Sequence, residues 1–460
     1  MMLPHRLLLL FVPVLLVGCA SVGGPPPLAI ENVTVIDATG KPAQPAMTVI
    51  VEGSRIAAVT RSAAARIPRN ARVIDGSGRF LIPGLWDMHT HLSFYGAEAL
   101  SMLVRNGVLA VRDLGGSLDE LDRWRAEIDR GARIGPNIFR AGPYIDGPKK
   151  FESSQNGALR KATTITVTNP SEARAAVDSL AGRVDTIKTH NGLSKESFLA
   201  VAAECHRLDM PLAAHPPSRN ITIEEVSDAH VTTIEHIEML TESIVFANVP
   251  PGEQPKKDPV TALDEMTDEY SMNLFRRFAR NDTAYDPTLV AYRTFMQEAV
   301  DLAPKDPSYV RAAAGRTKMF NRFVELVGLM KHAGVNVVTG TDFGIRPETV
   351  KWPVPVPGSD LHDEMKLFVQ GGFTPMEALQ SATILPARIL RVADRLGTIE
   401  PGKEADLVLL DADPLAEIAN TRRIRGVIQA GRWLPRAELD SLLIGVKRAV
   451  QSAVDRESRK

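Results

Sequence analysis

The sequence contains little cysteine and almost no excess of either charge. Its two cysteines are Cys19, near the N-terminus, and Cys205, in an alanine-rich stretch with a helical pattern. If Cys19 is modified, as argued below, an intrachain disulfide is excluded even in an oxidising compartment. With 54 basic and 55 acidic side chains, the chain lacks the basic footprint of a nucleic-acid-binding protein. We therefore expect no nucleic-acid partner, and we expect Cys205 to be a buried packing residue.

A long hydrophobic run is also missing, except for a short one at the N-terminus. Residues 7–17 are apolar and follow His5 and Arg6, but they are too few to cross a bilayer permanently, which indicates a secretory signal. The run ends in the residues LVGC at 16–19. This tetrapeptide resembles the bacterial lipobox, in which cleavage precedes the cysteine and the cysteine is acylated. The alternative is a plain signal with an incidental cysteine.

The lipobox interpretation predicts the organisation of the first 27 residues. Residues 1–18 are then a lipoprotein signal peptide, Cys19 carries the lipid, and 19–27 form a flexible tether. Ala20 and Ser21 follow the cysteine. An aspartate after the cysteine would indicate retention at the inner membrane, and these two positions contain none. We expect an exported protein that is lipid-anchored in the bacterial cell envelope, faces the periplasm and is held at the outer membrane.

Both ends of the mature chain have a β pattern, and the middle does not. Short valine-rich runs broken by Gly, Pro and Asp fill residues 28–82, and the same character returns at 395–435. The simplest account is one small β-sandwich domain built from both chain ends. It would flank a continuous central domain at 83–394, and residues 436–460 predict a C-terminal helix.

The central domain alternates short apolar runs with helical patterns, as βα units do. The number of strand candidates is eight, which equals the number of strands in a closed barrel. We therefore predict fold class α/β, with a closed (β/α)8 TIM barrel. An open doubly wound sheet is the alternative, but no glycine-rich dinucleotide fingerprint follows the first strand. The candidates are residues 81–88, 107–113, 137–141, 184–189, 210–215, 231–236, 283–287 and 335–341.

Four histidines stand where barrel enzymes keep their active sites, at the C-terminal ends of strands. His89 and His91 end the first strand. Residues two apart in an extended chain point to the same side, so both imidazoles can reach one metal ion. His215 and His236 close the fifth and sixth strands. Each alone could be a structural histidine, but together they indicate metal ligands, because neutral imidazole is the commonest ligand.

Two further polar residues end barrel strands. Asp342 closes the eighth, where a carboxylate can bind a metal and move protons, although a helix N-cap is the alternative. Lys188 ends the fourth strand. A protonated lysine has no lone pair for a metal, but a desolvated lysine loses its proton readily and could add CO2 to become an anionic carbamate. An ordinary ion-pairing lysine is the alternative, and the sequence alone leaves both open.

Taken together, these residues resemble a known ligand set, that of the binuclear amidohydrolases with a carboxylated lysine. The chain is similar to the imidazolonepropionase-like and Xaa-Pro dipeptidase branch of that superfamily, from about residue 29 to 433. The family also implies the bipartite β-sandwich. The residues that carry the resemblance are His89-Thr90-His91, Lys188, His215, His236 and Asp342, with NVTVID at 32–37, LIPGL at 81–85, VRDLGG at 111–116 and GTIEPGKEADLV at 397–408.

The resemblance implies two divalent metal ions. His89, His91 and Asp342 would hold one, His215 and His236 would hold the other, and N6-carboxylysine at Lys188 would bridge them together with a hydroxide. Zinc is the default for such nitrogen and oxygen ligands, with manganese and cobalt left open. The hydroxide would attack the substrate carbonyl, and Asp342 would take its proton and pass it to the departing nitrogen.

The function predicted is hydrolysis of a C–N (amide or peptide) bond in a small substrate, a dipeptide or an N-acyl amino acid. A mononuclear imidazolonepropionase-like or deaminase-type hydrolase of a cyclic amide or amidine is one alternative. Others are a lactonase or esterase, and a lipoprotein that keeps the barrel only as a scaffold. Whether the chain forms a homo-oligomer stays open. The proposed substrate contacts are Tyr144, Tyr292 and Arg346, with Lys149 and Lys150 as further cations.

Overall fold

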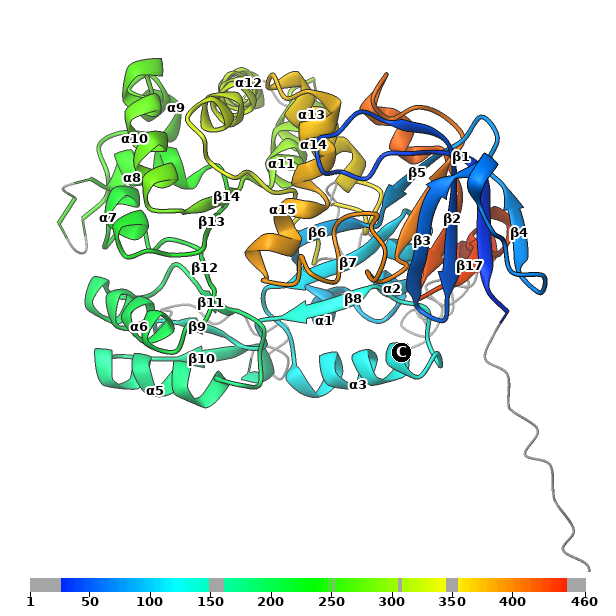
Figure 1. The fold of residues 1–460 in the computed structure, drawn as a ribbon. Helices are drawn as coiled ribbons and strands as arrows, with labels where there is room; N and C mark the ends of the chain where they lie inside the picture. Colours follow the sequence, from blue (N-terminus) through cyan, green and yellow to red (C-terminus); the bar gives the residue numbers. More distant parts are fainter. Residues whose placement is uncertain are drawn as a thin grey trace, which may run out of the picture.

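The computed structural model describes residues 26–148, 161–247, 249–250, 253–304, 308–344 and 355–444. Within these ranges, the chain forms a parallel α/β domain beside a mixed β-sheet (Figure 1). None of the helices described there combines the length and apolar character that a membrane span needs. Cys19, Lys149, Lys150 and Arg346 lie outside the described residues.

The mixed sheet contains eight strands from both ends of the chain. β1 pairs with β2 in antiparallel fashion and with β4 and β5 in parallel fashion, and β15 joins β5 to the C-terminal strands. The prediction that both chain ends build one β-unit is confirmed, while its division into two layers stays a prediction. The strands are β1 (Leu28–Val35), β2 (Gln44–Glu52), β3 (Arg55–Arg61), β4 (Arg72–Asp75), β5 (Phe80–Pro83), β15 (Leu407–Leu410), β16 (Ile424–Gln429) and β17 (Arg432–Pro435).

The second group of strands is parallel throughout and forms a three-stranded and a six-stranded sheet. Two short strands, β9 and β10, lie in the six-stranded sheet and were not predicted from the sequence. The strands are β6 (Leu85–Thr90), β7 (Val108–Asp113), β8 (Asn137–Arg140), β9 (Tyr144–Asp146), β10 (Thr164–Thr166), β11 (Ile187–Thr189), β12 (Leu212–Ala214), β13 (Thr233–Glu235) and β14 (Ala284–Asp286).

Backbone hydrogen bonds connect these two sheets into a ring. Asp185 N donates to Arg140 O at 2.8 Å, which joins β11 to β8. On the other side, residues 335–343 lie between β14 and β6, because Val338 N donates to Tyr285 O and Met88 N donates to Thr339 O, both at 2.9 Å. The predicted eighth strand is thus present as a connecting segment held by single bridges rather than by a continuous ladder.

The first predicted strand, residues 81–88, is in fact two strands that separate at Gly84. β5 belongs to the mixed sheet, and β6 is the first strand of the parallel ring. Gly84 N donates to Asp406 O at 2.8 Å, and a Cβ at residue 84 would lie 2.7 Å from Leu109 Cβ. Only glycine allows this close approach, which brings the two sheets together.

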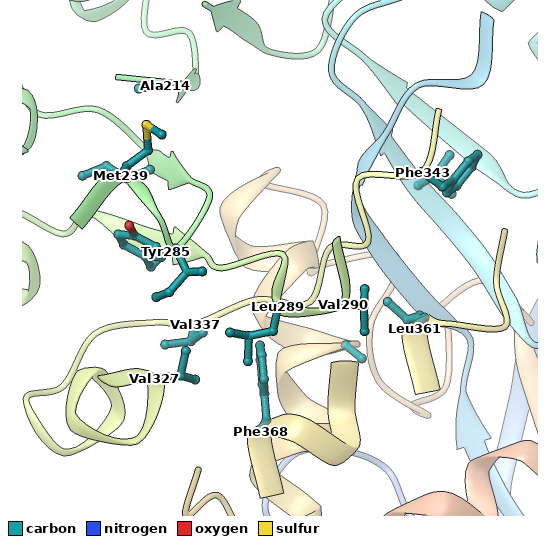
Figure 2. Close-up of a cluster of buried hydrophobic side chains, with 14 of the residues drawn as sticks. Ala214, Met239, Tyr285, Leu289, Val290, Val327, Val337, Phe343, Leu361 and Phe368 are labelled. Carbon is teal, nitrogen blue, oxygen red and sulfur yellow. The ribbon is translucent and has the colours of Figure 1, made fainter. Parts of the chain in front are cut away.

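The helices follow the parallel strands and cover them. Figure 2 shows Leu289, Val327, Val337 and Phe368 gathered where three helices meet the segment after α12. From α13, Glu364 accepts hydrogen bonds from the first two N–H groups of α11, at 2.9 and 2.8 Å, and so caps that helix.

Residues 436–444 are also helical, and the rest of the predicted C-terminal helix, 445–460, lies outside the described residues. The other helices are α1 (Leu92–Tyr95), α2 (Glu98–Arg105), α3 (Leu118–Asp129), α5 (Pro170–Leu180), α6 (Lys195–Arg207), α7 (Ile223–Asp228), α8 (Met239–Phe246), α9 (Pro259–Leu263), α10 (Asp268–Arg280), α11 (Leu289–Leu302), α12 (Ser308–His332), α13 (Leu361–Gln370), α14 (Pro375–Ser381) and α15 (Ile384–Ile389), with 3-10 turns at Ser62–Ala64 and Ile418–Arg422.

Candidate metal centre

The structure brings the predicted histidines together at one end of the parallel strands. The rings of His89 and His236 lie 4.6 Å apart between centroids, as do those of His236 and His215, and His89 and His91 lie 5.4 Å apart. His190, which follows β11, adds a fifth ring 4.7 Å from His215. Positions that are far apart in the sequence therefore converge, because each ends a strand of the same ring.

Asp342 lies among these imidazoles. Its Oδ1 is 3.1 Å from His91 Nε2 and 3.5 Å from His89 Nε2, and its Oδ2 is 3.9 Å from His236 Nδ1. Burial opposes ionisation of the Asp342 carboxyl, but His89, His91 and Lys188 outweigh it and lower its pKa. Asp342 is therefore a carboxylate at neutral pH, which is the form that a metal ion binds.

Both buried imidazoles are held neutral. Burial lowers the pKa of His89 and of His236 well below the usual value, and the nearby charge of Lys188 lowers each further. His236 Nδ1 lies 3.1 Å from Thr288 Oγ1, so a hydrogen bond there leaves Nε2 for another partner. Neutral imidazole with one nitrogen fixed in this way is suited to metal ligation.

Lys188 lies on β11 and is buried, with a fractional exposure of 2%. Its Nζ has no hydrogen-bond partner among the described residues. Burial lowers the pKa of this amine to about 8, although Glu235 and Asp342 favour its charged form. A buried nitrogen without a partner is costly, so the geometry fits an amine that is chemically modified or that supports a further group.

Two overlapping groups of side chains place their ligand atoms within 4.8 Å of one another: His89 with His236 and Asp342, and His89 with Glu235 and Asp286. Arg112 decides between them. Its Nη2 lies 2.8 Å from Glu235 Oε1 and 3.5 Å from Asp286 Oδ2. A permanently charged guanidinium in the second group would repel a divalent cation, so the first group is the better metal site.

Several polar residues that support this site were not predicted. Glu235 Oε2 lies 2.9 Å from His89 Nδ1, and its carboxylate also contacts Arg112. Asp87 accepts bonds from His89 N at 3.2 Å and from Thr341 N and Oγ1 at 3.0 and 2.6 Å. Each is an acidic residue that precedes a predicted histidine ligand by one or two positions, and that was the signal available in the sequence.

Glu238 is a third acidic residue near the site, at the start of α8. Burial, together with the charges of Glu242 and Asp342, raises the pKa of its carboxyl to about 8. Asp113, at the end of β7, accepts bonds from Leu92 N at 2.6 Å and Gly115 N at 3.2 Å. Asp113 therefore fixes the loops beside His91 through their backbone.

Of the three predicted substrate contacts, Tyr144 lies beside the histidine cluster, and the hydroxyl of Tyr292 contacts another side chain. The Tyr144 ring is buried on β9 and lies 5.1 Å from the ring of His190, which puts it beside the histidine cluster. The Tyr292 hydroxyl points to Met319 Sδ at 3.4 Å. Burial and the charge of Glu238 raise the pKa of Tyr292 to about 12. Arg346 lies outside the described residues.

A sequence profile described as the amidohydrolase family matches residues 80–434. The chain belongs to the amidohydrolase family. It is accordingly a metal-dependent hydrolase acting on carbon–nitrogen bonds, and the resemblance predicted from the sequence is confirmed. For this amidohydrolase the family also implies a TIM barrel, in agreement with the ring of parallel strands.

Individual proteins of known sequence or structure are also similar to this amidohydrolase. A dihydroorotase of Pelotomaculum thermopropionicum is 25% identical over 427 residues, covering 84% of this chain and 89% of the relative. An imidazolonepropionase of Streptomyces griseus is 25% identical over 393 residues, covering 81% and 87%. The crystal structure of a candidate prolidase from Bifidobacterium longum has a TM-score of 0.67 and 27% identity, covering 92% of this chain and 99% of that one.

Proposed function

We propose that this amidohydrolase cleaves the amide bond of a small substrate, a dipeptide or an N-acyl amino acid, at a site with two divalent metal ions. His89, His91 and Asp342 would hold one ion, and His215 and His236 the other. Lys188, carboxylated on Nζ, would hold both. The observation that carries the proposal is the buried Lys188 Nζ, which has no partner among the described residues although it lies within reach of the charges of Glu235 and Asp342.

Bound zinc, or manganese or cobalt in its place, would lower the pKa of a water molecule and polarise the substrate carbonyl. The protein residues perform the remaining work. Asp342 is ionised in the free protein, so its carboxylate can accept the proton of the attacking water. It then returns that proton to the departing amine, which is a poor leaving group unless it is protonated. Tyr144, whose ring lies 5.1 Å from that of His190, would donate a hydrogen bond to the substrate.

A second candidate function is hydrolysis of a cyclic amide or amidine, by a mononuclear imidazolonepropionase-like or deaminase-type reaction. It is favoured by the two relatives above, a dihydroorotase and an imidazolonepropionase, whose names denote action on the cyclic compounds dihydroorotate and imidazolonepropionate. The candidate prolidase favours a linear peptide substrate. Lactone or ester hydrolysis would need less protonation of the leaving group and is a third activity to measure.

Metal content and a substrate panel distinguish these functions. We would measure zinc per chain and then assay Xaa-Pro, Xaa-Arg and N-acyl amino-acid substrates beside dihydroorotate, imidazolonepropionate and lactones. About two ions per chain with turnover of linear amides supports the proposal. One ion per chain, or turnover confined to cyclic substrates, supports the second candidate. Inactivity of the metal-loaded protein on the whole panel would reject both.

We also propose the finer organisation and the location that the sequence predicts. The mixed sheet would fold as a two-layer sandwich from 28–82 and 395–435, beside a closed barrel at 83–394. Cys19 would carry a lipid that holds the protein in the cell envelope, facing the periplasm. Metabolic labelling with a fatty acid tests the anchor, because a Cys19→Ser variant should remain unlabelled. Labelling of that variant would show that the lipid is elsewhere.

A further inference from the structure

A cavity of about 650 Å³ lies on the mixed sheet, and four of the eleven residues that line it are arginines. Its walls come from β4, β15, β16, β17 and the segments beside them, at the end of the molecule that Figure 1 shows opposite to β13 and β14. Four arginines face a single acidic residue, Asp75. The arginines are Arg72, Arg79, Arg425 and Arg436. The cavity therefore carries an excess of positive charge, in a chain whose net charge is −1.

Two of these arginines are neutralised by neighbours, and two are not. Arg79 lies 3.3 Å from Asp411, and Arg436 lies 2.7 Å from Asp440. Arg72 and Arg425 are both exposed, and neither has an ion-pair partner among the described residues. A surface cation without a counter-charge is available to an anionic partner.

The same cavity contains apolar side chains that reach solvent. Val73 is 50% exposed, which is high for a valine in a strand. Trp433 on β17 is half-buried and lines the cavity wall. Tryptophan beside basic residues is the composition of surfaces that enter the headgroup region of a bilayer, because the ring is apolar and its N–H is polar.

The described chain begins beside this cavity. Arg72 N donates to Pro27 O at 2.8 Å, and Leu28 pairs with Arg72 in the sheet. The eight residues 20–27 extend at most about 30 Å. A lipid on Cys19 would therefore hold the arginine face within about that distance of the membrane surface. A tether of this length raises the local concentration of the membrane and so adds to the attraction that the face itself supplies.

We propose that the face formed by Arg72, Val73, Arg425 and Trp433 docks on the anionic phospholipid surface to which the chain is tethered. The inference shares the lipid anchor with the proposed function but does not depend on the hydrolytic reaction. A second copy of the chain fits poorly, because a symmetric contact would set arginines against arginines. The segment 445–460 fits poorly as well, since it has five basic and two acidic side chains.

The experiment uses residues 20–460, which retain every described residue but cannot be acylated at Cys19. Sedimentation with vesicles of phosphatidylglycerol and phosphatidylcholine is compared with sedimentation with phosphatidylcholine alone. We expect binding only to the anionic vesicles, and loss of that binding in about 1 M salt, where the Debye length is about 3 Å. Each basic residue near an anionic leaflet is worth about fivefold in binding, so Arg72→Gln with Arg425→Gln should weaken vesicle binding about 25-fold.

A matched pair removes the same charge from distant helices. Arg174→Gln with Arg276→Gln, at exposed positions of α5 and α10, should bind anionic vesicles as the parent does. If both double variants lose the same amount of vesicle binding, overall charge explains the binding, and the proposal is overturned. Binding of inorganic phosphate without vesicle binding, or a dimer that the Arg72 and Arg425 pair abolishes, would also overturn it. Hydrolytic activity on soluble substrate should be unchanged in both pairs, so failure here is distinct from failure of the proposed function.

Discussion

Glu235 Oε2 lies 2.9 Å from His89 Nδ1, with both side chains fully buried, and Arg112 contacts the same carboxylate from the other side. Arg112 Nη2 lies 2.8 Å from Glu235 Oε1, and its Nε donates to Met88 O at 2.7 Å. The guanidinium thus ties β13 to β6. Because His89 contacts Glu235 through Nδ1, its Nε2 is directed toward Asp342, and Glu235 acts as a positioning residue for the metal site.

Glu235→Gln should weaken metal binding by about 10- to 100-fold, because the neutral amide no longer orients His89 or raises its basicity. The kcat should fall with metal occupancy, while KM at saturating metal stays close to that of the parent. Zinc titration followed by kinetics checks both. Glu364→Gln is the control, since that buried carboxylate caps α11 instead. It should lower stability and leave zinc affinity unchanged, and equal zinc affinities in Glu235→Gln and the parent would contradict the positioning role.

The contrast between His89 and Glu235 shows what the sequence reveals about the site. His89, His215, His236 and Asp342 were predicted because each follows a strand, and the ends of parallel strands meet at one edge. Glu235 could not be assigned a role from the sequence, because its partners His89 and Arg112 come from other strands. These residues become neighbours only when the parallel strands close into a ring. In the same way, Gly84 divides one apolar run into two strands because it pairs with Asp406, which lies far along the chain.

The second prediction concerns carboxylation of the Lys188 amine. Its burial lowers the pKa of its amine to about 8, so at pH 7 roughly a tenth is neutral and able to attack CO2. After removal of metals with a chelator, the rate of reactivation by zinc and bicarbonate should rise between pH 7 and 9 and level off above the lysine pKa. Reactivation that is independent of bicarbonate would show that Lys188 is not carboxylated.

Lys188→Ala tests the same residue by substitution. It should lose bound metal and activity, and a short carboxylic acid such as formate should restore part of both, because its carboxylate fits the space left by the carbamate. Lys195→Ala is the control, since that lysine pairs with Glu225 at the surface of α6. It should retain metal and should not respond to formate.

Asp342 allows the carboxylate charge to be removed with little change of the backbone. Its φ is 54°, in the left-handed region that asparagine adopts more readily than most other residues. Asp342→Asn should therefore fold normally and lose about 10²- to 10⁴-fold in kcat, the usual contribution of a proton-transfer residue. Kinetics at full metal occupancy check this, and near-parent turnover with metals bound would exclude Asp342 as the proton shuttle.

Gly115 lies between Tyr144 and His91. A Cβ at this position would be 2.9 Å from Tyr144 Cδ1 and 3.3 Å from His91 Nδ1, so Gly115→Ala must displace the tyrosine or the ligand. Displacement of about 1 Å in an active site can cost about 100-fold in rate, and we expect a loss of that order in kcat/KM. Gly315→Ala, within α12, meets only Val260 Cγ2 and should retain full activity. Unchanged kinetics in Gly115→Ala would place Tyr144 outside the substrate site.

His362 links stability to pH through a buried ring outside the candidate metal centre. Its Nδ1 lies 2.9 Å from Thr421 Oγ1 and its Nε2 lies 3.0 Å from Asn106 O. Burial, with Arg422 nearby, lowers its pKa from 6.5 to about 3. The unfolded chain therefore binds one more proton than the folded chain between those values. The stabilisation is complete above pH 6.5 and is lost as pH falls toward 3, with a slope of about 1.4 kcal/mol per pH unit.

Replacing the ring with a group that cannot be protonated removes this dependence. His362→Gln should have a free energy of unfolding that falls less steeply between pH 6 and 4 than that of the parent, by about 1.4 kcal/mol per pH unit. Urea unfolding at a series of pH values measures the two slopes. His206→Gln, at an exposed histidine of α6, is the matched control and should keep the parent slope. If His362→Gln also keeps it, the proton uptake belongs to other groups, because a buried neutral imidazole cannot leave the slope unchanged when it is removed.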